Sequence, residues 1–194
     1  MNPLPRKQAI RGHLAFLLGC LGAGASIASI YATPVEGAAA LGCGVDALSC
    51  DTALTSRFSA VAGIPLGVFG LFYFSFWTLN LRAFLRTGEG IYRTMLSWVT
   101  MTGAVVSITL GSIMFLVLRA PCLYCLLTHL ANLGSLALLW PALRWRPNFR
   151  FGGDHFWHFL SLSAISLLAA TALFFANKAH VLEAQLDRAS RTLW

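Results

Sequence analysis

The chain has 194 residues, of which 57% are hydrophobic and only 11% are charged, and its mean hydropathy is +0.70. Charged residues are less than half as frequent as the roughly 25% of an ordinary soluble domain, which excludes a soluble globular protein. The 14 Lys and Arg outnumber the 7 Asp and Glu, but they lie in short gaps between long apolar runs. This placement indicates membrane topology and not nucleic-acid binding.

Five apolar runs are each about long enough to cross a membrane, at roughly 20 residues per crossing. We expect helices at about 13–31, 61–81, 95–118, 122–140 and 156–176. A signal peptide is a weaker interpretation of the first run, which has nearly full spanning length and contains a Gly-Ala-Gly-Ala-Ser segment suited to helix packing. The predicted fold class is therefore an all-α integral membrane protein.

The distribution of basic residues predicts the orientation, because Lys and Arg near span ends stay on the cytoplasmic side. One side would carry nine of them, namely Arg6, Lys7, Arg11, Arg82, Arg86, Arg93, Arg144, Arg146 and Arg150. The other side would carry five, namely Arg57, Arg119, Lys178, Arg188 and Arg191. We therefore expect a cytoplasmic N-terminus, with the loop 32–60 and the tail 177–194 facing outward. The tail has helical spacing, and it either continues the last helix or lies along the membrane interface.

Four of the five cysteines form two close pairs, and both pairs fall on the predicted outer side. Cys43 and Cys50 are separated by six residues in the outward loop, a spacing that can close a disulfide without strain. Cys122 and Cys125 form a Cys-X-X-Cys motif directly after Pro121, at the start of the fourth predicted helix. The positive end of a helix and its free N–H groups stabilise a thiolate, so the sequence predicts a reactive pair there.

Other roles for the cysteines stay open at this stage. The four paired cysteines could bind a structural zinc ion, although the spacing of Cys43 and Cys50 is unusual for zinc and an oxidising exterior favours disulfides. They could also form two purely structural disulfides, although a membrane bundle of this size scarcely needs them. The fifth cysteine, Cys20, lies in the first apolar run beside glycines, and we expect it to be a small packing residue.

At these residues the chain resembles the vitamin K epoxide reductase family in its bacterial form. The resemblance spans about residues 14–139 and rests on the order of the motifs. A cysteine pair in a long loop is followed by Ser56-Arg57-Phe58, by Gly-Ile-Pro-Leu-Gly-Val-Phe-Gly-Leu-Phe-Tyr at 63–73, and by the Cys-X-X-Cys motif. The related DsbB-type oxidases carry their two cysteine pairs in the reverse order.

The resemblance implies a four-helix bundle around a quinone site, with a fifth transmembrane helix beside it, and places this family domain at residues 1–176. It implies that a reduced thioredoxin-like partner attacks a Cys43–Cys50 disulfide at Cys43, and that Cys50 then attacks Cys122. Cys125 leaves as a thiolate and passes the electron pair to a quinone, ubiquinone or menaquinone. The implied protein is an oxidase in the bacterial inner (cytoplasmic) membrane.

Four further residues are candidates for the quinone site. His129 follows Cys125 at i+4 on the same helix face, where it would donate a hydrogen bond to a quinone carbonyl or satisfy a neighbouring helix. Phe69 and Tyr73 are spaced for one face of the second helix, as is Phe76, although such a stripe often reflects plain packing. Ser56 matches a Ser or Thr position of the family, and locally it would serve equally well as a helix cap.

The chain departs from the family pattern at its C-terminal end. Many bacterial members continue into a fused thioredoxin-like domain, whereas no cysteine follows Cys125 in this sequence. We therefore expect a separate thioredoxin-fold (DsbA-type) partner, membrane lipid around the helices, and no nucleic-acid or metal ligand. Two other functions remain open: a non-catalytic membrane assembly subunit with structural disulfides, and a metal-binding membrane protein.

Overall fold

A computed structural model describes residues 6–32, 50–143 and 153–192 of the chain. Its elements in chain order are α1 (Arg6–Ala32), α2 (Cys50–Thr55), β1 (Ala60–Val61), β2 (Ile64–Pro65), α3 (Leu66–Thr87), α4 (Gly90–Ser112), the π-helix η1 (Ile113–Leu118), α5 (Leu123–Leu143) and α6 (Gly153–Thr192). Five helical segments are long and apolar enough to cross a membrane, at Arg6–Ala32, Leu66–Thr87, Gly90–Leu118, Leu123–Pro141 and Trp157–His180. The predicted all-α membrane fold with five spans is confirmed.

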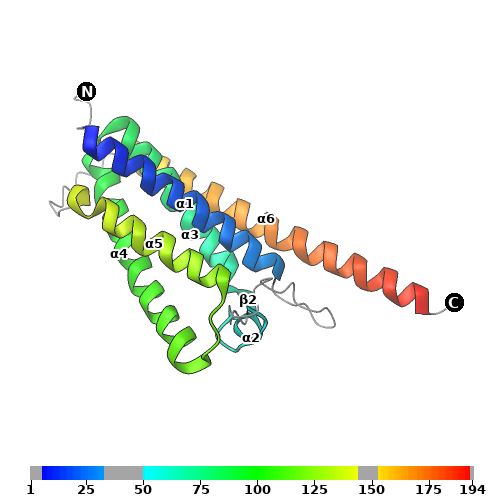
Figure 1. Cartoon of the computed structure of the whole chain (residues 1–194). Helices are drawn as coiled ribbons and strands as arrows, with labels where there is room; N and C mark the ends of the chain where they lie inside the picture. The colour runs from blue at the N-terminus through cyan, green and yellow to red at the C-terminus, as the bar shows by residue number, and fades with distance from the viewer. Residues whose placement is uncertain (1–5, 33–49, 144–152, 193–194) are drawn as a thin grey trace.

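The helices form a bundle of four with the fifth beside it. α1 packs against both α3 and α5, α4 packs against α3 and α5, and α6 packs mainly along α3 (Figure 1). A buried hydrogen bond joins α3 to α4, in which the Trp77 indole donates to the Thr100 hydroxyl over 2.7 Å. α6 runs past the bundle, so the two chain ends lie at opposite ends of the molecule (Figure 1).

The second spanning helix begins at Leu66 and not at the predicted residue 61. Residues 60–65 form a two-stranded hairpin, in which Val61 pairs with Ile64. Its turn residues Ala62 and Gly63 have φ of 52° and 79°, which is the left-handed geometry of a tight hairpin turn and is incompatible with a helix. The helix therefore starts only after Pro65. It extends beyond the predicted end at 81 to Thr87, where the left-handed φ of 68° at Gly88 terminates it.

The last helix is longer than its apolar run. α6 continues without a break through the described residues of the predicted tail 177–194, as far as Thr192. Of the two alternatives for the tail, the structure therefore has the helical continuation. The Asn177 amide donates a hydrogen bond of 3.2 Å to the Ile30 carbonyl, which ties α6 to the end of α1.

Candidate functional site

One residue of each cysteine pair lies in the same buried cluster. Cys50, at the first position of α2, and Cys122, just before α5, are 2% and 0% exposed and pack together with Ala32, Leu54 and Met114, among others. Cys50 is disulfide-bonded, whereas Cys122 and Cys125 are free thiols. The fourth residue of the predicted set, Cys43, lies outside the described residues. The structure thus brings Cys50 to the Cys-X-X-Cys motif.

The turn before α5 fixes the position of Cys122. α4 ends in the π-helix η1, and Arg119 then adopts a left-handed φ of 50° that reverses the chain. Met114 holds this reversal at two points, because its carbonyl accepts from the Ala120 N–H at 3.3 Å and its sulfur from the Cys122 N–H at 3.4 Å. The Cys122 carbonyl accepts the N–H of Leu126 at 2.9 Å and opens the helix.

This position makes Cys122 an acidic thiol. A hydrogen bond from the Cys125 thiol lowers the pKa of Cys122 from an ordinary value of 9.0 to about 7, and the backbone N–H groups of Cys125 and Tyr124 lower it further against the opposing effect of burial. The sulfur of Cys122 thus accepts hydrogen bonds at the N-terminus of α5, as a side chain that caps a helix does. The predicted preference for a thiolate at this helix start is supported by these contacts.

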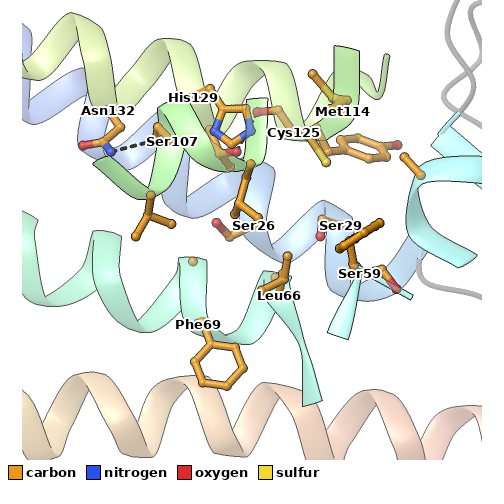
Figure 2. Close-up of a pocket in the computed structure, with 18 of the residues that line it drawn as sticks. Ser26, Ser29, Ser59, Leu66, Phe69, Ser107, Met114, Cys125, His129 and Asn132 are labelled. Atoms are coloured by element: carbon orange, nitrogen blue, oxygen red, sulfur yellow. Dashed lines mark hydrogen bonds between the residues drawn. The ribbon is translucent and has the colours of Figure 1, made fainter. Parts of the chain in front are cut away.

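A cavity of about 320 Å³ lies beside Cys125, in the half of the bundle where α5 begins. Its lining comes from α1, α3, α4, η1, α5 and the segment 53–59, and it is mostly apolar with a few hydroxyls. Cys125 and His129 both border it from α5, in the order that their i, i+4 spacing dictates (Figure 2). No hydrogen bond joins the His129 ring to any of the residues that the structure describes. An apolar cavity of this size with a few polar groups is typical of small-ligand sites.

A family model, that of the vitamin K epoxide reductase family, matches residues 13–140. The chain belongs to this family. No curated protein matches the chain by sequence. Membership supports, in general terms, a membrane oxidoreductase of thiols, disulfides and a quinone, with the matched region ending within α5.

The four residues predicted to contact a quinone differ in how they face the cavity. His129, Tyr73, Phe69 and Ser56 all line the cavity. The ring of Phe69, however, points toward α6 and away from Cys125 (Figure 2), and its side chain is 44% exposed. Tyr73 and His129 are therefore the two predicted residues whose placement best suits a ligand beside Cys125.

Three interpretations from the sequence are corrected. Phe76 is not among the residues that line the cavity, since it packs between Phe72 and Phe159 of α6. Ser56 does not cap α3, because its hydroxyl donates to the Ala53 carbonyl at the end of α2 over 2.8 Å. Cys20 is exposed on α1 and is not a packing residue of the bundle interior.

Sequence reasoning missed a polar chain at the inner end of the cavity. The Tyr73 hydroxyl donates to the Asn132 side-chain oxygen over 2.7 Å. The Asn132 amide donates to the Ser107 hydroxyl over 2.8 Å (Figure 2). The signal for Asn132 was present, since it follows His129 by three residues and so lies on the same helix face. Within the described part of the chain, no cluster of three or more His, Cys, Asp or Glu could hold a metal ion.

Proposed function

We propose that the protein is a thiol:quinone oxidoreductase that makes disulfides in a separate thioredoxin-fold (DsbA-type) protein. The observation that carries the proposal is that Cys50 and Cys122 belong to one buried cluster, while Cys125 borders the cavity. A relay of thiol–disulfide exchange needs this arrangement, because each sulfur must reach the next. The protein would then connect an aqueous partner to a lipid-soluble electron acceptor.

The relay begins when a partner thiolate attacks Cys43 of a Cys43–Cys50 disulfide and releases Cys50 as a thiolate. Cys50 attacks Cys122 of a Cys122–Cys125 disulfide and releases Cys125. The second thiol of the partner attacks the partner sulfur bonded to Cys43, so the partner leaves oxidised and Cys43 is a thiolate. Cys43 then attacks Cys50 in the Cys50–Cys122 bond and releases Cys122. Two electrons have moved from the partner to the Cys-X-X-Cys pair, and the loop disulfide is restored.

The acidity of Cys122 suits the last exchange of this relay. A thiol of lower pKa leaves faster in exchange, and the pKa of Cys122 is lowered to about 7. The structure has Cys50 disulfide-bonded and Cys122 and Cys125 reduced, which is the state that this step produces. In that state the proton on Cys125 is shared with Cys122 through their hydrogen bond.

The cavity fits a quinone ring, of the ubiquinone or menaquinone class. Its walls are mostly apolar, and the imidazole of His129 borders it from the same helix as Cys125. His129 would hold the ring by a hydrogen bond, with Tyr73 at the other end and with Phe69 and Ser56 at its edges. A quinone bound there accepts two electrons and two protons, and the Cys122–Cys125 disulfide reforms.

We further propose that the protein lies in the bacterial inner membrane with its N-terminus in the cytoplasm. The family domain would occupy residues 1–176, surrounded by lipid, with residues 177–194 on the outer side. Nine of the 14 basic residues would then face the cytoplasm, as the positive-inside rule requires. The cluster of Cys50 and Cys122 would face the outer compartment, which is the oxidising side where protein disulfides form and persist.

The test is quinone reduction by the purified protein with a reduced thioredoxin-fold substrate. Cys125→Ala should abolish quinone reduction with any thiol, because the pair that faces the cavity is broken. Cys43→Ala should abolish it with the protein substrate but retain it with dithiothreitol, which can reach the second pair directly. Cys20→Ala is the matched control, since this cysteine is free and exposed on α1, and it should keep full activity. No turnover by the native protein would refute the proposal and favour structural disulfides.

A further inference from the structure

The inner end of the cavity carries a set of polar groups that the relay does not use. Tyr73 of α3, Asn132 of α5 and Ser107 of α4 form one chain of hydrogen bonds, of 2.7 and 2.8 Å, and all three residues line the cavity. Asn132 and Ser107 are 3% and 7% exposed. Polar side chains within a membrane span are costly unless they are satisfied or functional, so this chain needs a physical explanation.

Several other hydroxyls around the cavity already donate to a nearby backbone carbonyl. Ser26 donates to the Gly22 carbonyl over 2.8 Å, and Thr128 donates to the Cys125 carbonyl over 2.8 Å. The Asn132 amide differs, because its nitrogen carries two hydrogens and the Ser107 hydroxyl takes only one. The hydrogen bond from Tyr73 to the amide oxygen sets which way the amide faces, and the nitrogen keeps one N–H that the bond to Ser107 does not use. One donor N–H is thus oriented at the inner end of the cavity.

The Asn132 donor lies on the same face of α5 as Cys125 of the Cys-X-X-Cys pair. Cys125, His129 and Asn132 occupy positions i, i+4 and i+7, which lie on one face of the helix, and they follow one another along the cavity (Figure 2). At 1.5 Å per residue, Asn132 lies about 4.5 Å beyond His129 and about 10 Å beyond Cys125 along the helix axis. The two donors therefore lie at successive depths, as two polar atoms on opposite edges of one ring require.

We infer that the chain of Tyr73, Asn132 and Ser107 is a second polar contact for the electron acceptor and binds the quinone oxygen that points away from Cys125. This inference rests on the proposed function and specifies how its acceptor is held. His129 and Asn132 together would bind both oxygens of a para-quinone and set the depth of its ring in the cavity. Tyr73 and Ser107 are positioning residues, because they orient the amide and do not need to touch the quinone themselves.

A purely structural role would predict a different pattern of residues. The hydrogen bond of Trp77 with Thr100 also joins α3 to α4, but neither residue lines the cavity and both are at most 1% exposed. Hydrogen bonds between membrane helices stabilise the fold only weakly on average. Stabilisation of the helix packing alone therefore does not explain why three polar residues line the cavity wall. The pair of Trp77 and Thr100 thus supplies a matched control.

The test compares steady-state kinetics of three variants, with menadione as the quinone and dithiothreitol as the thiol. Asn132→Leu and Tyr73→Phe should raise the KM for menadione about tenfold, the value of one neutral hydrogen bond, while the KM for dithiothreitol stays unchanged. Thr100→Val removes a buried interhelical hydrogen bond of the same kind and should leave both KM values unchanged. The melting temperature of each variant, measured in detergent, shows that it is folded.

The outcomes separate this inference from the proposed function. If native protein reduces menadione but Asn132→Leu and Tyr73→Phe keep its KM, as Thr100→Val does, the chain is structural and the inference is wrong. If a variant does not fold, binding of menadione to the singly substituted Ser107→Ala protein decides the same question. If native protein reduces no quinone at all, the proposed function fails first, and binding of menadione then tests whether Asn132 contacts it.

Discussion

Replacing Cys125 should make Cys122 a weaker acid, and the structure gives the size of the change. The hydrogen bond from the Cys125 thiol is the largest cause of the shift of the Cys122 pKa from 9.0 to about 7. Cys125→Ala removes this bond but leaves Cys122 buried, and burial alone raises the pKa of a thiol. Only the backbone N–H groups of residues 124 and 125 then still favour the thiolate. We therefore expect the pKa to return to about 9, close to its ordinary value.

The sign of the pH dependence follows from these values. In the native protein the Cys122 thiolate is present above about pH 7 and is lost as the pH falls through this value. Each pKa unit is a tenfold change in the ionisation equilibrium, so at pH 7 about half of native Cys122 is thiolate, against roughly 1% in Cys125→Ala. At neutral pH the variant should therefore hold about fifty times less Cys122 thiolate.

The assay is the ultraviolet absorbance of the thiolate, followed across a pH titration in a Cys20→Ala background. Cys50 does not contribute, because its sulfur is in a disulfide. Cys125→Ser is the matched variant, since its hydroxyl can still donate to Cys122, and it should keep a pKa near 7. A Cys122→Ala protein should show no transition near pH 7. If Cys125→Ala titrates at the same pH as the native protein, the thiol hydrogen bond is not the cause of the acidity.

The spans could be predicted from the sequence, whereas their ends could not. Each span is an apolar run of about 20 residues, and hydropathy alone locates it. The ends depend on backbone geometry that hydropathy does not report. The left-handed turn at Ala62 and Gly63 delays α3 to Leu66, although residues 61–65 are almost entirely apolar. Conversely, α6 passes the end of its apolar run, because charged residues do not by themselves stop a helix.

Within the site, local spacing predicted what lies on one helix and failed for what joins several helices. The i, i+4 relation places Cys125 and His129 on one wall of the cavity, as predicted. The same logic put Phe69 and Phe76 on the quinone face with Tyr73, but the Phe69 ring points toward α6 and Phe76 packs against Phe159 of that helix. The role of Met114 depends on a π-helix and a chain reversal, and neither has a local sequence signal that hydropathy or spacing can detect.

Two substitutions test the packing that holds the bundle and the cavity. Asn177→Leu removes the hydrogen bond from α6 to the last turn of α1. It should lower the free energy of unfolding by about 0.6 kcal/mol, the average for hydrogen bonds between membrane helices, and leave the KM for quinone unchanged. Thermal unfolding in detergent measures the loss of stability. Gly103→Ala should act on the cavity itself, because a Cβ there would overlap the Tyr73 hydroxyl and lie 2.8 Å from the Asn132 nitrogen. Overpacking of this kind costs about 1–3 kcal/mol, and Tyr73 must move to relieve it, so the KM for quinone should rise with the loss of stability. Gly111→Ala on the same helix is the control, since its Cβ would meet its nearest atom at 3.8 Å, an ordinary contact, and a helical Gly→Ala change is neutral or stabilising by up to about 1 kcal/mol. If the two glycine substitutions change stability and KM equally, Gly103 is not in close contact with the polar chain of Tyr73, Asn132 and Ser107. The role of that chain in shaping the cavity would then also be contradicted.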